Sequence, residues 1–186
     1  KGSLLFDSPM LFSLAFVILL IFGGFTVLML SIAAADIQYH DTYFVVAHFH
    51  YVMVAGAVFS GTAAVYYWLP KWCGKMYDET MGKVQFWIAF IGFNITFMPQ
   101  HFLGLAGMPR RYADYGLQFA DWNMVSSIGA FMYGAAQILF LFNVVRTITY
   151  GKPVDKPEVW EGAEGLEWTV PTPAPYHTFE KPPQVQ

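Results

Sequence analysis

Charged side chains are scarce in this sequence. Only 12% of its 186 residues are Asp, Glu, Lys or Arg, whereas 56% are hydrophobic. Soluble domains usually carry about 25% charged residues, so the composition excludes an ordinary soluble domain and indicates a membrane protein. The formal net charge of −3 is too small to indicate a nucleic-acid partner. We therefore expect the lipid bilayer, and no nucleic acid, to surround the chain.

Cysteine is almost absent as well. Cys73 is the only cysteine, which excludes an internal disulfide and any cysteine metal motif; we expect it at the end of a helix. The first residues, KGSLLFDSPM, include no initiator methionine and no charged region before a short apolar core. They do not fit a signal peptide, and we expect the chain to begin inside a loop.

Long uncharged runs are what the sequence does have. About 20 apolar residues in a helix cross the hydrocarbon core of a bilayer, and lipid accepts only helices and closed barrels. The runs are too long for barrel strands, so we predict an all-α polytopic membrane helical bundle within residues 1–150. The four predicted helices span about 9–34, 42–69, 84–104 and 123–146.

The last 36 residues, 151–186, differ from the rest. They hold seven prolines and show no apolar periodicity, which predicts an extended tail on the inner surface rather than a domain. Basic residues in short loops face the inner side of a membrane. Six of them follow the second or the fourth predicted helix: Lys71, Lys75, Lys83, Arg146, Lys152 and Lys156. Those segments and the N-terminus are therefore predicted to face the cytoplasm or the mitochondrial matrix.

Small residues recur at helical spacing on two of the predicted helices. They are Gly56, Ser60 and Ala64 on the second, and Ser126, Ala130 and Gly134 on the fourth. Such faces let helices approach closely in lipid, so we predict helix contacts along both.

Two histidines interrupt the second run. His48 and His50 are two residues apart, so on an α-helix they point about 200° apart and cannot bind one metal together. The pattern predicts two separate centres on opposite sides of one helix. Haem is the leading candidate, because histidine is its usual axial ligand and an apolar macrocycle suits an aromatic-rich bundle. The alternative is a pair of imidazoles that only hydrogen-bond to neighbouring helices.

Polar residues near the outer end of that helix suggest further sites. His40 and Asp41 could bind Mg²⁺ or Mn²⁺, or Asp41 could simply cap the helix. Arg110 and Arg111 lie in a loop on the outer side, where basic residues are unusual. Planar guanidinium groups match carboxylates, so we expect the two arginines to pair with haem propionates. Asp36 could lie beside a propionate or face water.

Three stretches resemble the C-terminal third of subunit I of the haem–copper respiratory oxidases, in the cytochrome c oxidase branch. They are HDTYFVVAHFHYV, MPQHFLGLAGMPRRYADY and LEWTVPTPAPYHTFE. The match runs from about Pro9 to about Pro182 and corresponds to the last four of that subunit's twelve helices. The resemblance implies reduction of O₂ to water, electrons from cytochrome c, and proton pumping. By this resemblance, only the assembled complex would carry out the reaction, and it would lie in a bacterial cytoplasmic or mitochondrial inner membrane.

The resemblance also implies roles for individual residues. His48 would be the axial ligand of a high-spin haem (haem a3) and His50 an axial ligand of a low-spin haem (haem a), with Phe49 between them. Arg110 and Arg111 would pair with the propionates, and Asp36 would lie near those of the high-spin haem. His40 and Asp41 would match a Mg or Mn site that subunit II completes.

Other parts of the implied machinery lie outside the sequence. The ligands of copper B and the second ligand of the low-spin haem would come from earlier helices of subunit I. The implied partners are the remainder of subunit I, subunit II with its copper A centre, and subunit III. His101 and His177 fall outside the implied metal ligands, and we expect them to be structural or surface residues.

Three other functions remain possible on the sequence alone. A quinol oxidase of the same superfamily would share these helices and differ in subunit II. A haem-bearing electron carrier without oxygen chemistry, like a cytochrome b, would usually need four histidines for two haems. A transporter whose histidines relay protons would contain no haem.

Overall fold

Four long helices dominate the computed structural model, which describes residues 4–179 and 181–183. Each is long and apolar enough to cross a membrane, so the prediction of an all-α polytopic membrane bundle is confirmed. Three are single α-helices: α1 (Ser8–Ser31), α5 (Glu79–Leu105) and α6 (Ala120–Tyr150). The second consists of α3 (Tyr43–Val54), a π-helical turn η1 (Ala55–Phe59) and α4 (Ser60–Cys73).

The ends of the helices differ from the ends of the uncharged runs. The first helix was predicted to reach residue 34, but α1 ends at Ser31 and a short helix α2 (Ala33–Tyr39) follows it. Helix α5 begins at Glu79 rather than at 84, because the Asp78 side chain caps it and accepts a hydrogen bond from the Met81 N–H at 3.0 Å. A cap and an acidic first turn stabilise a helix start, so Asp78 and Glu79 extend α5 beyond its apolar run.

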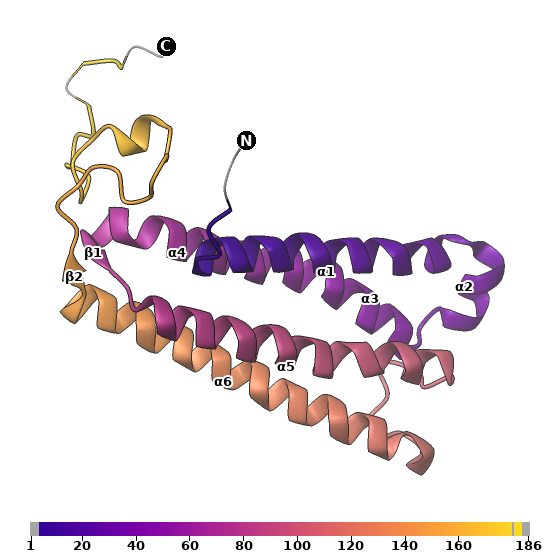
Figure 1. Cartoon of the computed structure of the whole chain (residues 1–186). Coiled ribbons are helices and arrows are strands. Elements are labelled where there is room, and N and C mark those ends of the chain that lie inside the picture. The colour runs from indigo at the N-terminus through magenta and orange to yellow at the C-terminus, as the bar shows by residue number, and fades with distance from the viewer. Residues whose placement is uncertain (1–3, 180, 184–186) are drawn as a thin grey trace.

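Helices α1, α3 and α4 form one side of the bundle, and α5 and α6 form the other (Figure 1). The start of α1, the strands β1 (Lys75–Met76) and β2 (Lys152–Pro153) and the tail lie at one end, the tail end. Helix α2 and residues 106–119, with the 3₁₀ turn η2 (Leu117–Phe119), lie at the other, the loop end. The segments that carry the six basic residues thus meet at the tail end.

Aromatic rings fill the core between the two sides. Phe12 of α1, Phe59 and Tyr66 of the second helix, and Phe86 and Phe93 of α5 are all buried. Phe12 meets Phe86 edge-on at 5.0 Å between ring centroids, and Phe59 meets Phe93 at 5.7 Å. Edge-to-face pairs at this distance are favourable beyond the area they bury, so they fix the packing of α1 and η1 on α5.

Helices α5 and α6 approach each other closely at two glycines. A Cβ added to Gly129 would lie 2.5 Å from the backbone nitrogen of Thr96, and one added to Gly92 would lie 2.8 Å from that of Tyr133. The predicted contact face through Ala130 and Gly134 is wrong, because Ala130 is exposed and Gly134 has open space beside it. Ser126, the third residue of that predicted face, is buried and donates to the Thr96 carbonyl oxygen at 2.7 Å, so the contact follows Ser126 and Gly129. Gly56, on the predicted face of the second helix, also has open space beside it.

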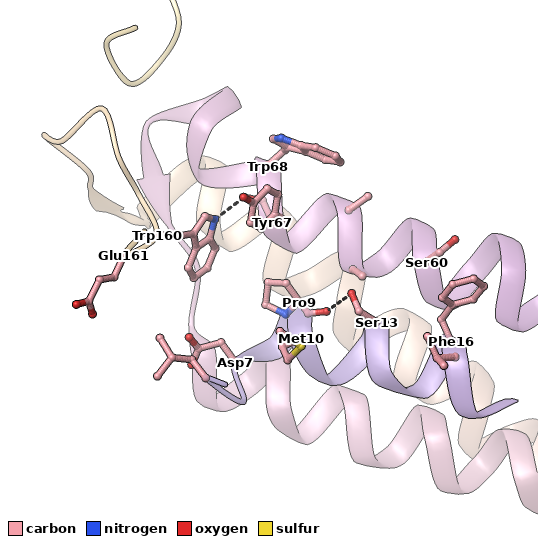
Figure 2. Close-up of a pocket in the computed structure, with 14 residues that line it drawn as sticks. Asp7, Pro9, Met10, Ser13, Phe16, Ser60, Tyr67, Trp68, Trp160 and Glu161 are labelled. Carbon is pink, nitrogen blue, oxygen red and sulfur yellow. Dashed lines mark hydrogen bonds between the residues drawn. The ribbon is translucent and has the colours of Figure 1, made fainter. Parts of the chain in front are cut away.

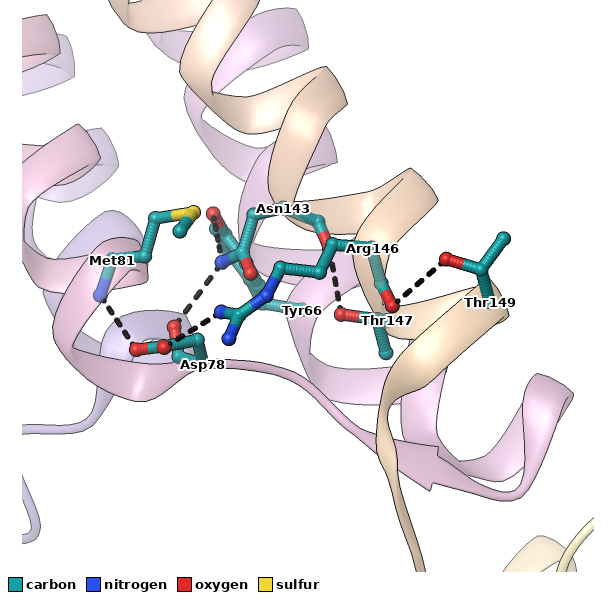
Figure 3. A network of polar contacts seen from close by, with 7 residues as sticks. All are labelled: Tyr66, Asp78, Met81, Asn143, Arg146, Thr147 and Thr149. Carbon is teal, nitrogen blue, oxygen red and sulfur yellow. Dashed lines mark hydrogen bonds and ion pairs between the residues drawn. The ribbon is translucent and has the colours of Figure 1, made fainter.

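A polar network joins α4, α5 and α6 at the tail end (Figure 3). Arg146 pairs with Asp78 at 2.8 Å, and the buried Asn143 amide donates to the Asp78 carbonyl oxygen at 3.2 Å. The same amide lies 3.4 Å from the Tyr66 hydroxyl. The hydrogen bonds from the Met81 N–H and from Arg146 hold the pKa of Asp78 below its ordinary value, so its carboxylate keeps its charge in the ion pair.

The tail is folded against the end of α4. Strand β2 pairs with β1, and the tail then forms a 3₁₀ turn η3 (Leu166–Trp168) in which Trp168 is buried. Lys71, only 3% exposed, donates hydrogen bonds to the carbonyl oxygens of Pro157 (3.1 Å) and Val170 (2.6 Å) and to the Thr172 hydroxyl (3.1 Å). The buried Lys71 ammonium group therefore holds together three parts of the tail, which has little regular structure of its own.

Candidate functional site

The two histidines of α3 face different helices. The Nδ1 atom of His48 lies 3.1 Å from the Gly23 carbonyl oxygen and 2.9 Å from the Thr26 hydroxyl, both on α1. The His50 ring instead stacks on Phe97 of α5, with centroids 4.1 Å apart and planes 15° apart. Helix α3 is regular over this stretch, so the two rings diverge as the 100° step per residue requires.

Each ring uses the same nitrogen for its protein contacts. His50 Nδ1 lies 2.7 Å from the carbonyl oxygen of Val46, one turn earlier on α3, and His48 Nδ1 contacts the Gly23 carbonyl oxygen. A carbonyl oxygen can only accept, so the ring nitrogen that faces it must carry the proton, and we assign the proton of both rings to Nδ1. Within the described chain, Nε2 of neither ring has a hydrogen-bond partner. A histidine held through Nδ1–H with an open Nε2 is oriented as metal-bound histidines are.

Phe49 lies between the two imidazoles in sequence and is half-buried. Its ring centroid is 4.5 Å from that of His50. Phe49 therefore contacts the neighbouring imidazole directly, on the side of α3 between the two ring directions.

The predicted polar residues of the loop end meet around Asp41. Both Nε and Nη2 of Arg110 lie 2.8 Å from one oxygen of the Asp41 carboxylate, and the Arg110 N–H donates to the Asp41 carbonyl oxygen at 2.9 Å. The His40 ring lies 3.3 Å from Asp36 and 3.7 Å from the other oxygen of Asp41. Hydrogen bonding by Arg110 lowers the pKa of Asp41 below its ordinary value. The contact joins the turn between α2 and α3 to the loop after α5.

Two of these residues have an unusual backbone. Asp41 has φ of 56° and Arg111 has φ of 67°, in the left-handed region that side chains other than glycine rarely adopt. The Arg111 side chain is exposed, and no ion pair joins it to any described residue. The two adjacent arginines thus differ: Arg110 is held by Asp41, and Arg111 is left to face outward.

At the predicted Mg²⁺ or Mn²⁺ site, the structure brings together the side chains of His40 and Asp41. Within residues 4–179 and 181–183, no group of three or more His, Cys, Asp or Glu side chains is placed to hold a metal ion. One oxygen of Asp41 is already engaged by Arg110. Asp41 also does not cap α3, because the Thr42 hydroxyl accepts from the Phe44 N–H. Among the described residues, His40 and Asp41 therefore do not complete a cation site by themselves.

Three further residues were given expected positions from the sequence, and the structure agrees for part of them. His101 is 5% exposed and lies among Phe22, Phe44 and Tyr51, so a surface position is wrong and it belongs to the core. His177 is exposed in the tail. Cys73 is the last residue of α4, as predicted.

Sequence reasoning missed the residues that orient the histidines. Thr26, Gly23 and Phe97 lie on other helices, and no motif in the sequence links them to His48 or His50. The one available signal was that a ligand histidine needs an acceptor for its second nitrogen, which predicts that a partner exists but not which residue it is.

Comparisons with known proteins agree on one family. The sequence model of the family described as cytochrome c and quinol oxidase polypeptide I matches residues 1–132. Cytochrome c oxidase subunit 1 of Cereibacter sphaeroides is 51% identical over 184 residues, which are 98% of this chain and 32% of that protein. Cytochrome c oxidase subunit 1 of Bacillus sp. (strain PS3) is 48% identical over 188 residues, covering 100% of this chain and 30% of that protein.

A solved structure shares the fold. A chain from the cryo-EM structure of a heme-copper terminal oxidase dimer superimposes with a TM-score of 0.67 over 78% of this chain and 27% of its own length, at 14% identity. This chain spans about a third of the length of the curated relatives that it matches.

Proposed function

Because the chain belongs to the cytochrome c and quinol oxidase polypeptide I family, we propose that it is the part of a terminal respiratory oxidase that carries one axial ligand for each of two haems. The assembled enzyme would reduce O₂ to water with electrons from cytochrome c and couple the reaction to proton pumping. The chain is a multi-pass membrane segment, and we place it in an energy-coupling membrane, either bacterial cytoplasmic or mitochondrial inner.

One observation carries this proposal. His48 and His50 leave α3 in different directions, each is fixed through Nδ1, and each has an open Nε2 among the described residues. Each ring thus has the one partner that a buried polar group needs, and its second nitrogen stays available to a metal. Two open nitrogens on opposite sides of one helix support two separate iron ligands. By the resemblance, His48 would bind the high-spin haem and His50 the low-spin haem, with Phe49 between them.

The surroundings of the two rings fit a haem. Exposed apolar side chains such as Phe25 and Leu28 of α1 continue beyond the packed core near the histidine level, and a macrocycle would cover such surfaces. Both histidines lie within about 11 Å, along the helix, of the start of α3 at the loop end, where Arg110 and Arg111 also lie. Guanidinium groups there would neutralise haem propionates, and Asp36 would lie nearby.

The chain's own residues would orient and tune the cofactors. Bound haem supplies the one-electron chemistry and, at the high-spin site, the position for oxygen. The Gly23 carbonyl oxygen and the Thr26 hydroxyl would hold the His48 ring and raise its basicity, and the Val46 carbonyl oxygen would do the same for His50. Stacking on Phe97 would fix the rotation of the His50 imidazole about its Cβ–Cγ bond.

Other components would come from outside this chain. Copper B and the second ligand of the low-spin haem would be held by the remainder of subunit I. Subunit II would bring copper A and complete a Mg or Mn site at His40 and Asp41, and subunit III would complete the complex. The two-donor geometry at His40 and Asp41 is consistent with a site that is shared between subunits.

Cytochrome c is the proposed donor, because both named relatives at about 50% identity are cytochrome c oxidase subunits. The family description also includes quinol oxidases, so a quinol donor is the second candidate. A copper-containing subunit II that co-purifies with the chain would support cytochrome c, and its absence together with quinol-dependent oxygen uptake would support the alternative.

The ligand assignment is tested by replacing each histidine in the complete enzyme. His48→Leu is expected to remove the high-spin signal and carbon monoxide binding, and His50→Leu to remove the low-spin signal, because each loses one axial ligand. Haem stoichiometry by pyridine haemochrome and the low-temperature optical spectrum measure this. His177→Leu, in the exposed tail, is the matched control. Full retention of both haem signals in either α3 variant would contradict the proposal.

A further inference from the structure

An apolar cavity lies between α1, α4 and the tail, away from the two histidines (Figure 2). It has a volume of about 640 Å³ and extends from Trp160 and Asp7 at the tail end to Phe16 and Ser60 further along the helices. Pro9 to Phe16 covers about 11 Å of helix. The cavity is therefore elongated and parallel to helices that cross the membrane.

The lining presents almost no free polar group. Its two serine hydroxyls are turned back on their own helices: Ser13 donates to the Pro9 carbonyl oxygen at 2.8 Å, and Ser60 donates to that of Gly56. Ala63, Ala64 and Val17 complete the middle of the cavity. The middle of the cavity therefore offers hydrocarbon contact and no free hydrogen-bonding group, which suits an aliphatic chain rather than a polar cofactor.

The tail closes one end of the cavity. Trp160 stacks on Tyr67, with ring planes 7° apart and centroids 5.9 Å apart, and its indole N–H donates to the Tyr67 carbonyl oxygen at 2.9 Å. Trp68 of α4 lies beside them. Tryptophan and tyrosine concentrate where hydrocarbon meets headgroups, so this end of the cavity lies at the level where a lipid changes from chain to headgroup.

Charge at this end is negative. Asp7 and Glu161 line the cavity, and no described lysine or arginine does. Among the described residues, Asp7 has one ion pair, at 3.9 Å with Lys83, whose ammonium group is closer to Glu79 at 3.5 Å. Lys71, the cation at the end of α4, is turned toward the tail carbonyl oxygens. Carboxylates at a headgroup level attract an ammonium group and repel an anionic headgroup.

We propose that this cavity binds one acyl chain of a membrane lipid whose headgroup carries an ammonium group, as phosphatidylethanolamine does. The chain lies along α1 and α4, and the ammonium group lies beside Asp7 and Glu161. The site is independent of the haem ligands, because none of its residues lies on α3.

The test uses the complete purified oxidase in lipid nanodiscs that contain trace phosphatidylethanolamine or phosphatidylglycerol with the same photoreactive diazirine acyl chain. Peptide mass spectrometry after illumination is expected to find label on Phe16, Val17 and Ala64. Labelling by phosphatidylethanolamine is expected to exceed that by phosphatidylglycerol about fivefold, the ratio expected for one weakly screened charge contact.

Two variants separate the chain site from the headgroup site. Ala64→Trp fills the cavity and is expected to remove the label, whereas Ala130→Trp, on the exposed face of α6, keeps it. Glu161→Gln is expected to keep the label and to remove most of the headgroup preference. Glu161→Gln and the comparison of the two lipids in the wild type still test the proposed lipid site if Ala64→Trp does not assemble.

Three outcomes would overturn the proposal. Absence of label in the wild-type cavity with both lipids would mean that protein fills it in the complete enzyme. Equal labelling by the two headgroups would remove the role of the carboxylates. Undiminished labelling in an assembled Ala64→Trp enzyme would place the acyl chain elsewhere.

Discussion

The Thr26 hydroxyl links α1 to His48 and accounts for much of how that imidazole is held. It donates to the Gly23 carbonyl oxygen at 2.8 Å and lies 2.9 Å from His48 Nδ1. Since the Gly23 carbonyl oxygen also receives the His48 N–H, the three groups form a small closed set of contacts. Side chains that hold a ligand histidine in this way tune the metal without touching it.

Replacement of Thr26 tests this positioning role. Thr26→Val keeps the shape and removes the hydroxyl, so the imidazole loses one partner and is less firmly oriented. We expect turnover to fall about 10-fold, at the low end of the range for such partners because the Gly23 carbonyl oxygen remains. If His48 and His50 are the proposed haem ligands, potentiometric titration should show a shifted midpoint for the haem assigned to His48 and none for the haem assigned to His50.

Thr26→Ser is the matched control, because it retains the hydroxyl and should restore the wild-type midpoint. A Thr26→Val enzyme with both midpoints and turnover unchanged would show that the hydroxyl has no influence on the ligand.

Individual residues also show how far the sequence could predict the site. The divergence of His48 and His50 follows from the helical repeat, and the structure agrees. The pairing of Arg110 with Asp41 was not foreseen, because it joins residues 69 positions apart and depends on how two loops meet. Lys71 was read as a marker of membrane sidedness, yet it is buried by the tail, and no local pattern predicts such a long-range contact.

At the scale of the element, uncharged runs were sufficient to find all four helices. They were not sufficient to find which faces touch. Small residues spaced four apart pointed to Ala130 and Gly134, but Gly129 makes the contact with α5. Either face would allow close approach, and the choice is made by the partner helix, where Gly92 and Thr96 provide the matching backbone surface.

Helix packing at Gly129 can be tested by adding a single methyl group. Gly129→Ala places a Cβ 2.5 Å from the Thr96 backbone nitrogen, so the two helices must separate. We expect a loss of about 1–3 kcal/mol, as for other overpacked sites. The loss of stability should appear as a faster release of haem from the purified enzyme at elevated temperature.

Gly134→Ala provides the comparison, since open space lies beside Gly134 and alanine favours a helix by about 0.5–1 kcal/mol relative to glycine. The two substitutions should therefore act in opposite directions. Equal stability of the two variants would mean that α5 and α6 do not approach at Gly129 in the assembled enzyme.

At the scale of the whole molecule, the tail is a folded part of the structure. Its proline content predicted an extended segment, and proline does limit its regular structure to β2 and η3. The buried side chains of Trp168 and Val170 and the stacked Trp160 were not predictable, because they are spaced irregularly and pack on the end of α4. The tail thereby supplies one wall of the cavity beside α1.

Removal of the Lys71 ammonium group is expected to release the tail. Lys71→Met keeps the length of the side chain but removes three hydrogen bonds, and each bond to a charged group contributes about 1.5–3 kcal/mol. Chymotrypsin should then cleave after Trp160 and Trp168 at least several times faster than in the wild type.

Lys71→Arg preserves the charge and several donors and should retain much of the protection. Lys156→Met changes an exposed lysine of the tail itself and should leave cleavage unchanged. Identical cleavage rates for Lys71→Met and the wild type would show that other contacts hold the tail in place.

The π-helical turn at Ala55–Phe59 has a consequence for the whole second helix. In an uninterrupted α-helix, the direction of every side chain from Tyr43 to Cys73 would be locked to that of His48. One additional residue in a turn offsets the phase by about 100°. The section before the turn, which carries the imidazoles, and the section after it, which carries Tyr66 and Lys71, are thus offset in phase, so the direction of the histidines does not follow from that of Tyr66.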